Sequence, residues 1–429
     1  MLTKEENEML TRVGPGTPMG ELLRRYWQPA ALSEELPPDG PPVPLRLMGE
    51  DLVLFRDQQG RPGLLGVHCS HRGADLSYGR LEDGGLRCIY HGWLYDVDGR
   101  CLEQPGEPAG STFHERIRQK AYPCEELGGL ILAYMGPGDP PLVPNYEFLH
   151  APDDCRSATK YVQNCNFLQG NEGNLDPVHL SFLHRMRRTE ERSRQLWGRL
   201  LTPTIQAEVT DYGTRIYSVR RLDDEHSYIR ITNFVMPNLC AIPTGEGGGF
   251  NTNWHVPIDD EHSWRYSIFF TRTIPVAASR MMRQNGSDLL PGYQLSRNKA
   301  NRYLQDREEM KTETYAGLGT NFVPHDTCAT EGAGPIQDRT QENPGTTEVG
   351  IFASRKVLFQ AIKDVMEGKD PLHVIRDPSK NHFPQIFVRD EMIPTSTDWR
   401  TYWTEAVEAA EAAIAEGRFE TATRVALSR

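Results

Sequence analysis

The sequence predicts an α+β protein with two parts: a small all-β domain, followed by a larger domain in which helices cover an antiparallel sheet. The 429 residues are enough for two substantial cores, because one hydrophobic core rarely extends beyond about 250–300 residues. Short strand patterns fill residues 43–141, and longer ones mixed with helical segments follow residue 160, an order typical of α+β folds. We expect an N-terminal helical segment over 1–26, the β domain over 27–150 and the larger domain over 151–429.

Local signals define the first third of the chain. Thr17 is a suitable N-cap and Pro18 fits the first helical position, where a missing N–H costs nothing. Asp98 and Gly99 follow a strand pattern at 93–97 and predict a hairpin turn. The proline- and glycine-rich residues 136–141 predict a linker at the end of the β domain.

The larger domain carries strand and helix patterns in turn. Residues 161–185 favour helix in places, and residues 295–315 are charged and favour helix. A helix near the C-terminus is predicted by apolar residues at helical spacing, Trp403, Val407, Ala410 and Ile414, with Gly417 as its end. Four stretches are predicted to be strands, at about 203–221, 227–242, 251–257 and 263–274.

Composition excludes several classes of function. The formal charge of −12, from 47 basic and 59 acidic residues, argues against nucleic-acid binding, which needs a basic surface. The polar N-terminus is not a secretory signal, and no apolar stretch is long enough to span a membrane. The eight cysteines are scattered, as in a protein of a reducing compartment. We therefore expect a soluble, cytoplasmic protein.

Two cysteine–histidine pairs lie close together in the β domain, Cys69-x-His71 and Cys88-x-x-His91. Each pair lets one loop present two ligands, so two loops can bring two thiolates and two imidazoles to one metal centre. Two histidines in place of two thiolates on one iron define a Rieske [2Fe-2S] centre. Nearby glycines allow close turns and expose N–H groups that can donate to sulfide.

On the residues alone, two other interpretations stay open. Zinc accepts the same ligand set, and cysteine–histidine pairs at similar spacing are common zinc signatures. The pairs could also be coincidental, because a motif is a hypothesis until its structural context supports it.

Asp176, His179 and His184 form a second group of metal-binding residue types. Two imidazoles and one carboxylate make the facial triad of non-haem Fe(II) oxygenases, which leaves positions open for O₂ and substrate. On a regular helix the two histidines would point about 140° apart, at roughly 100° per residue. We therefore predict a π-like turn or a break between them. Without a metal, both would be helix residues with hydrogen-bond partners, and Asp176 before Pro177 would be a helix N-cap.

Five stretches together carry a family resemblance: CSHRGA at 69–74, CIYHGW at 88–93, the pattern D-x-x-H-x-x-x-x-H at 176–184, TPMGELLRRYWQP at 17–29 and GPIQDRTQE at 334–342. They resemble the α (oxygenase) subunits of Rieske non-haem iron aromatic ring-hydroxylating oxygenases of the phthalate 4,5-dioxygenase type. The resemblance implies a Rieske domain, a helix-grip catalytic domain and a homotrimer. It also implies which residues bind the metals: Cys69, His71, Cys88 and His91 for the [2Fe-2S] cluster, and His179 and His184 for a mononuclear Fe(II).

The third iron ligand implied by the family is a carboxylate from the C-terminal half. Asp326 is our candidate, because an Asp five residues before Glu331 resembles the family's ligand segment. Asp338 is the rival, although a salt bridge to a nearby arginine would explain it too. His325 is expected to lie in a loop or to support the site without binding the metal.

Family resemblance also implies an electron path. A separate flavin and iron–sulfur reductase would reduce the cluster, and electrons would then reach the iron of a neighbouring subunit through His91, Asp176 and His179. Asp176 would act by accepting a hydrogen bond from an imidazole on each side and so orienting both rings.

The activity implied is O₂-dependent oxidation of an aromatic substrate, by ring hydroxylation or by O-demethylation. Four arginines in the strand region, Arg215, Arg220, Arg221 and Arg230, are candidates to pair with a substrate carboxylate. The alternative is that most of them are solvated charges on the strand surface.

Two other classes of protein remain as alternatives. A Rieske electron carrier without oxygenase activity would hold about two iron atoms instead of three, and residues 160–429 would have no purpose. A zinc-stabilised binding module would be colourless and free of iron.

Overall fold

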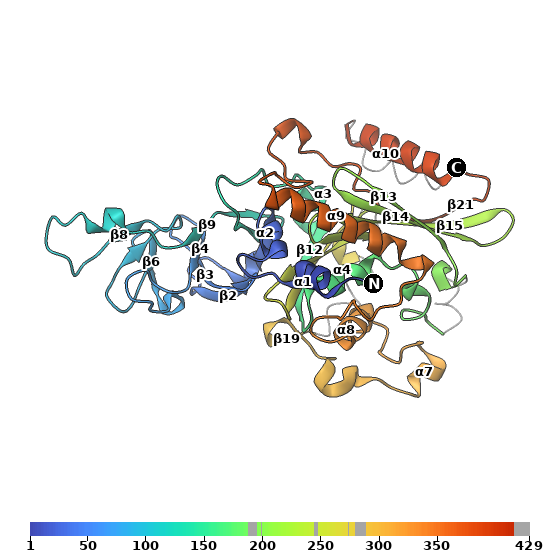
Figure 1. Cartoon of the computed structure of the whole chain (residues 1–429), viewed down its shortest axis with the longest axis horizontal. Coiled ribbons are helices and arrows are strands. Elements are labelled where there is room, and N and C mark those ends of the chain that lie inside the picture. Colours follow the sequence, from blue (N-terminus) through green and yellow to red (C-terminus); the bar gives the residue numbers. More distant parts are fainter. Residues whose placement is uncertain (188–194, 199, 244–247, 273, 279–288, 416–429) are drawn as a thin grey trace.

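A β lobe projects from a larger, helix-covered sheet in the computed structural model of the chain (Figure 1). The structure describes residues 1–187, 195–198, 200–243, 248–272, 274–278 and 289–415. None of the helices within these residues is both long and apolar enough to cross a membrane.

The N-terminal segment forms two helices, α1 (Lys4–Thr11) and α2 (Pro18–Leu23). The predicted start of α2 is confirmed, because the Thr17 hydroxyl accepts a hydrogen bond from the N–H of Gly20. Both helices pack against the larger part of the molecule: Asn7 donates to the carbonyl of Gln337 at 3.0 Å. They lie where the lobe meets the larger part (Figure 1).

The lobe is all-β, as predicted, and consists of three small antiparallel sheets. One sheet joins β1 (Trp27–Leu32), β11 (Leu130–Tyr134) and β10 (Cys124–Leu127). The second joins β2 (Val43–Leu47), β3 (Glu50–Arg56), β4 (Pro62–Gly66) and β9 (Ala121–Tyr122). The third joins β5 (Arg80–Glu82), β6 (Gly85–Arg87), β7 (Leu94–Tyr95) and β8 (Cys101–Glu103). The predicted turn at Asp98 and Gly99 connects β7 to β8 and is confirmed.

Strand β3 separates two hydrophobic cores, because successive side chains of a strand point to opposite faces. Leu52 and Leu54 belong to the main core of the molecule. Val53 and Phe55 belong to a small core at the far end of the lobe, which also contains Cys69 and Cys88. The lobe is further tied to the larger part by a buried ion pair of 2.6 Å between Glu35 and Lys160.

The larger part is built on one antiparallel sheet with the order β12-β18-β17-β16-β15-β14-β13, in which β21 also pairs with β15. The predicted strand stretches at 203–221 and 227–242 are each two strands joined by a turn. Thr210 makes the first turn by accepting from the N–H groups of Tyr212 and Gly213, a local contact that strand periodicity does not reveal. The strands are β12 (Arg156–Gln163), β13 (Thr204–Val209), β14 (Gly213–Arg221), β15 (His226–Val235), β16 (Leu239–Pro243), β17 (Phe250–Pro257), β18 (Ser263–Phe270) and β21 (Arg389–Pro394).

Helices pack against this sheet, which confirms the predicted α+β architecture. The main ones are α4 (Phe167–Leu175), α8 (Phe322–Gly332), α9 (Val349–Met366) and α10 (Trp399–Ala415), with the short α3 (Glu147–His150) at the lobe junction. Helix α10 lies where its apolar spacing predicted, and Trp403 is buried against Phe387. The side chains of Ala410 and Ile414, and Gly417, lie outside the described residues.

The prediction of helix over 295–315 is wrong. The structure has only the short β20 (Gln294–Leu295), a 3₁₀ segment over Lys299–Leu304 and α7 (Glu309–Thr312). Arg302, Tyr303 and Leu304 have positive φ angles of 53°, 55° and 49°, which a continuous right-handed helix cannot contain. Helix-favouring side chains are therefore overruled here by the path of the backbone.

Candidate metal centres

The two cysteine–histidine pairs lie in two loops of matching backbone geometry. In the first loop the N–H of Cys69 donates to the carbonyl of Ala74 and the N–H of Gly73 donates to the carbonyl of Cys69, both at 2.8 Å. In the second loop, Cys88 and Trp93, and Gly92 and Cys88, repeat this arrangement, both at 2.9 Å.

A glycine at the fifth position closes each of these loops. Gly73 and Gly92 have φ angles of 74° and 77°, in the left-handed region that glycine adopts without strain. The two pairs therefore lie on the same six-residue loop, with the histidine at its third position in one case and at its fourth in the other.

The four side chains of the loops divide into a buried pair and an outer pair. Cys69 and Cys88 are buried in the small core of the lobe, and burial together with the neighbouring Cys69 thiol raises the pKa of Cys88. The rings of His71 and His91 are 4.5 Å apart, and His91 is exposed. Thiolates on the inside and imidazoles on the outside fit a cluster whose histidine-bound iron faces the surface.

Two further observations support this fit. The Nδ1 atom of His71 is buried and has no hydrogen-bond partner among the described residues, as expected of an atom that would bind metal. The hydroxyl of Tyr95 lies 3.1 Å from Cys69 Sγ and 3.0 Å from Ser70 Oγ. Hydrogen bonds to the sulfur ligands are one of the factors that set the potential of an iron–sulfur cluster.

The second centre brings together His179, His184 and Asp326. One ligand atom from each of these three residues lies within 4.8 Å of the others. Asp326 Oδ1 is 2.8 Å from His184 Nε2 and 3.8 Å from His179 Nε2. The centre forms where two segments far apart in the sequence meet: the histidines follow α4, and Asp326 lies on α8.

The predicted break between His179 and His184 is confirmed, as a short 3₁₀ turn and not as a π-like turn. The 3₁₀ segment covers His179–Ser181, and Phe182 leaves the helical region with φ −121° and ψ −68°. The break turns both rings toward the same point, with their centroids 5.0 Å apart.

The protonation states of this centre suit a divalent metal. Burial lowers the pKa of His184 to about 4, so the ring is neutral near pH 7, the form that binds metal. Burial alone would raise the pKa of Asp326, but His184 and Arg265 beside it hold that pKa below its ordinary value. Two neutral imidazoles and one carboxylate are the donor set of a non-haem Fe(II) site.

Asp176 contacts its neighbours differently from the prediction. It ends α4 and is not the N-cap of a following helix, because the next helical turn begins at His179. Its backbone carbonyl, and not its carboxylate, lies 2.5 Å from His179 Nδ1. The Oδ1 atom of the carboxylate accepts from the N–H of Val178 at 2.7 Å. The Oδ2 atom is 4.0 Å from His179 Nδ1.

The two alternatives for the third ligand have different surroundings. Asp326 faces the histidines, whereas Asp338 is exposed and accepts hydrogen bonds from the N–H and hydroxyl of Thr340. His325 lies on α8 and not in a loop. It is buried against the metal centre, with its Nδ1 3.3 Å from His184 Nδ1.

A buried ion network explains the stretch at 334–342. Arg339 is fully buried and pairs with Glu172 of α4 at 2.7 Å, and Arg355 of α9 bridges Glu172 and Glu342 at 2.6 and 2.5 Å. The network fixes the helix that leads into Asp176 and His179. The sequence does not reveal these roles, because both arginines meet at Glu172, which lies 167 and 183 residues from them in the chain.

A cavity of about 390 Å³ leads to the second centre. Its lining includes His179, Asp326 and Asp176, together with Asn343 and Pro344, which are exposed. The metal centre is therefore reachable from outside the chain.

The four arginines of the strand region have different surroundings. Only Arg221 is a surface charge, paired with Asp224. Arg215 stacks over Trp403 at 4.0 Å, and Arg230 pairs with Asp390 at 2.9 Å. The expectation that most are solvated is wrong, because helix α10 and strand β21 cover this part of the sheet.

Arg220 differs from the other three because it pairs with no carboxylate among the described residues. It is 1% exposed. Its guanidinium donates to Ser218 Oγ at 2.8 Å, to the Pro177 carbonyl at 2.9 Å and to Ser181 Oγ at 3.2 Å. Burial lowers its pKa to about 10.

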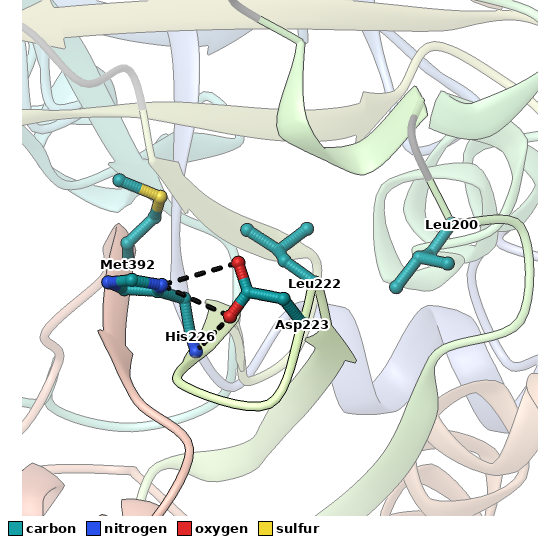
Figure 2. A pocket seen from close by; sticks show the side chains of 5 residues that line it. All are labelled: Leu200, Leu222, Asp223, His226 and Met392. Atoms are coloured by element: carbon teal, nitrogen blue, oxygen red, sulfur yellow. Dashed lines mark hydrogen bonds and ion pairs between the residues drawn. The ribbon is translucent and has the colours of Figure 1, made fainter.

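Figure 2 shows a separate, open pocket at the end of the β14–β15 hairpin, lined by Leu200, Leu222, Asp223, His226 and Met392. His226 already bonds Asp223 at 3.1 Å. The lining includes none of the side chains of the two metal centres.

Two family models match the chain. The Rieske [2Fe-2S] domain matches residues 26–123, and a family described as LigXa C-terminal domain like matches residues 133–422.

Curated relatives match over most of their length. The phthalate 4,5-dioxygenase oxygenase subunit of Pseudomonas putida is 36% identical, over 99% of this chain and 100% of the relative. The 5,5'-dehydrodivanillate O-demethylase oxygenase subunit of a Sphingobium species is 36% identical, over 89% of this chain and 85% of the relative.

Solved structures share the fold. The terminal oxygenase of carbazole 1,9a-dioxygenase from Nocardioides aromaticivorans superposes with a TM-score of 0.56 at 17% identity, over 83% of this chain and 97% of that one.

Proposed function

Because this chain belongs to the Rieske oxygenase subunits with a LigXa-type C-terminal domain, we propose that its two residue clusters hold the two metal centres of such an enzyme. Cys69, His71, Cys88 and His91 hold the [2Fe-2S] cluster, within a domain over 27–150. His179, His184 and Asp326 hold a mononuclear Fe(II), within a catalytic domain over 151–429. The convergence of these last three side chains within 4.8 Å is the observation that carries the proposal.

When bound, the cluster supplies electrons and the mononuclear iron supplies the centre that activates O₂. The chain's own residues prepare this site. Burial keeps His184 neutral, and the carbonyl of Asp176 fixes the ring of His179. Three protein ligands on one side leave the other side free for O₂ and substrate.

The substrate we propose is an aromatic compound with a carboxylate, oxidised by ring hydroxylation or O-demethylation. Arg220 supports the carboxylate, because it is a buried guanidinium held by neutral acceptors next to the segment that carries His179. A buried charge is costly unless it is paired. A substrate carboxylate would pair it through the one Nη1 hydrogen that remains after the contacts above and the Nε bond to the Leu200 carbonyl. The two relatives above are named for a phthalate dioxygenase and an O-demethylase, so both reactions stay in the proposal.

In a homotrimer, His91 of one copy would hold the cluster beside Asp176 and His179 of a neighbouring copy, and the cluster would supply electrons to the mononuclear iron there. The strands that carry the cluster loops lie at the end of the molecule away from α4 and α8 (Figure 1). Asp176 lines the cavity that opens at the surface, so a histidine of another copy can approach it. Ile89 and Tyr90, 60% and 56% exposed, form an apolar loop tip suited to such contacts.

The electron donor of the cluster is, in this proposal, a separate protein. A flavin and iron–sulfur reductase reduces the cluster, and the protein works in the cytoplasm. Solved relatives include a reduced complex of oxygenase and ferredoxin in carbazole 1,9a-dioxygenase, which supports a separate electron donor.

Iron and sulfide analysis tests the centres. We expect about three iron atoms and two sulfides per chain, with a Rieske spectrum in the reduced protein. About two iron atoms would favour an electron carrier, and a colourless protein containing zinc would favour a binding module.

A substrate screen tests the reaction. Aromatic acids and methoxylated aromatic acids should give products with a compatible reductase, scored as product and not as O₂ consumption. Arg220→Met should raise KM for an acid substrate and leave KM for its methyl ester unchanged. Equal effects on acid and ester would remove Arg220 from carboxylate recognition.

A further inference from the structure

Arg265 contacts the carboxylate of Asp326 on the side away from the histidines. Its Nη1 atom lies 3.2 Å from Oδ2 of Asp326. The other oxygen, Oδ1, lies 2.8 Å from His184 Nε2. The two carboxylate oxygens are therefore divided, one toward the histidines and one toward a guanidinium.

The sheet holds Arg265 firmly in this position. Arg265 lies on β18 and pairs in register with Tyr161 of β12 on one side and His255 of β17 on the other. It is 5% exposed, and its guanidinium lies 5.5 Å from the ring of Tyr161. The side chains of Tyr161 and His255 flank Arg265 on the same face of the sheet, which limits its movement away from Asp326.

Helix α4 packs closely over the same place. A Cβ at Gly170 would lie 2.2 Å from His255 Nδ1, so no larger residue fits between α4 and β17 without a shift. Helix α4 is thus packed tightly on His255, the strand neighbour of Arg265, and Arg265 in turn contacts Asp326 of α8.

We propose that Arg265 is a positioning residue that restricts Asp326 to one oxygen, Oδ1, as a metal ligand. This inference rests on the proposed function, in which Asp326 binds the mononuclear iron. A free carboxylate can bind a metal through one or both oxygens. The guanidinium donates a charge-assisted hydrogen bond to Oδ2, so binding of this oxygen to the iron would compete with that bond.

Single-oxygen binding matters because an oxygenase needs open positions at its iron. The facial triad works by leaving such positions for O₂ and substrate. If Asp326 bound through both oxygens, it would fill one of them. Arg265 would therefore preserve the capacity of the site to take an external ligand, and it need not tighten iron binding.

The test measures this capacity directly in the intact, Fe(II)-loaded protein. Nitric oxide is an uncharged probe of an open position at Fe(II), so loss of the arginine charge does not itself repel or attract it. We expect Arg265→Met to weaken nitric oxide binding, followed by electron paramagnetic resonance, by about 10- to 100-fold, the usual effect of removing a group that supports a metal ligand. X-ray absorption at the iron edge should show one more oxygen ligand in this variant.

Two further variants separate positioning from general packing. Arg265→Lys keeps a donor for Oδ2 and should restore most of the nitric oxide affinity. Arg24→Met removes another buried guanidinium from a carboxylate, Glu50, in a part of the chain that does not contact Asp326. It should lower thermal stability but leave the nitric oxide affinity and the iron-edge spectrum unchanged.

The outcomes distinguish this inference from the proposed function. Equal nitric oxide affinity and equal coordination in wild type and Arg265→Met would overturn the role of Arg265 alone. The same loss of affinity in Arg265→Met and Arg24→Met would also overturn it, because packing would then be the cause. A wild-type protein that takes up no Fe(II) beyond the cluster would overturn the proposed function instead.

Discussion

The two candidate metal centres are built in opposite ways. The cluster loops lie between residues 69 and 93, each closed by its own backbone hydrogen bonds, and their tip is exposed. The other centre joins a broken segment after α4 to a residue of α8, and a buried ion network and the central sheet hold it in place. The first centre is determined locally, and the second depends on the whole domain.

This difference has a consequence for stability. The cysteines of the loops share a small core with Phe55 and Tyr95. The main core runs from the N-terminal helices through Leu54 to the large sheet and α9. We therefore expect that either centre can be lost while the other is retained.

Asp326→Asn should remove the mononuclear iron and abolish oxygenation. An amide has no charge to balance the metal, and one of its two polar groups is a donor where a ligand is needed. Iron analysis should fall from about three to about two atoms per chain, with an unchanged cluster spectrum.

The reciprocal variant removes a ligand of the cluster instead of a ligand of the mononuclear iron. His91→Ala should remove the cluster and leave Fe(II) at the second centre. Loss of both metals in either variant would show that the centres depend on one another.

Asp176→Asn should leave both metals bound, because the backbone carbonyl that contacts His179 is unchanged. It should reduce turnover by about 10- to 100-fold, because the carboxylate oxygen proposed to accept from a histidine of the neighbouring copy is lost. The amide oxygen can still accept from Val178, so the local fold is kept. Stopped-flow oxidation of the reduced cluster, compared with product formed in a single turnover, measures the uncoupling. Wild-type product yield in this variant would remove Asp176 from the electron path.

Arg339→Met should destabilise the catalytic domain by about 3–5 kcal/mol, because it leaves Glu172 buried without one of its two cations. The midpoint of urea unfolding followed by tryptophan fluorescence should fall, while the visible spectrum of the cluster is lost only at higher urea. Arg46→Met, which breaks an exposed pair with Asp51, is the control and should cost less than about 1 kcal/mol. Loss of the two signals together in Arg339→Met would contradict separate stabilities.

Tyr95→Phe should lower the reduction potential of the cluster by on the order of 50 mV, since about 1.4 kcal/mol corresponds to 59 mV for one electron. The hydroxyl stabilises the Cys69 thiolate more in the reduced cluster, which carries more negative charge. Spectroelectrochemical titration measures the shift, and Ser70→Ala, which removes a contact of the Tyr95 hydroxyl, should give a smaller one. An unchanged potential in Tyr95→Phe would mean that the hydroxyl does not donate to the sulfur.

The features that the sequence predicts correctly are those set by residues close together in the chain. Thr17 as a cap, the turn at Asp98 and Gly99, and the break after His179 are set by neighbouring residues, and the structure confirms them. The turns inside two predicted strands and the absence of a helix over 295–315 depend on side-chain contacts and backbone angles that periodicity does not contain.

The second centre shows the limit most clearly. Asp326 was selected by family resemblance, and the structure brings it to the histidines, where its role as a ligand stays a prediction. Arg265 carried no signal, because an arginine among strand-forming residues has no distinctive spacing. Only the pairing of β18 with β12 and β17 places it opposite Asp326.

Strand β3 finally bears on how this protein could be recombined with its relatives. Its even-numbered side chains, Leu52 and Leu54, serve the main core, and its odd-numbered ones, Val53 and Phe55, serve the cluster core. A chimaera that receives the cluster loops of a relative should therefore keep Leu52 and Leu54. Val53 and Phe55 should be replaced by the residues that the relative has at the same positions. The boundary between the two exchangeable parts is therefore not a linker. It lies within β3, where alternate residues belong to different parts.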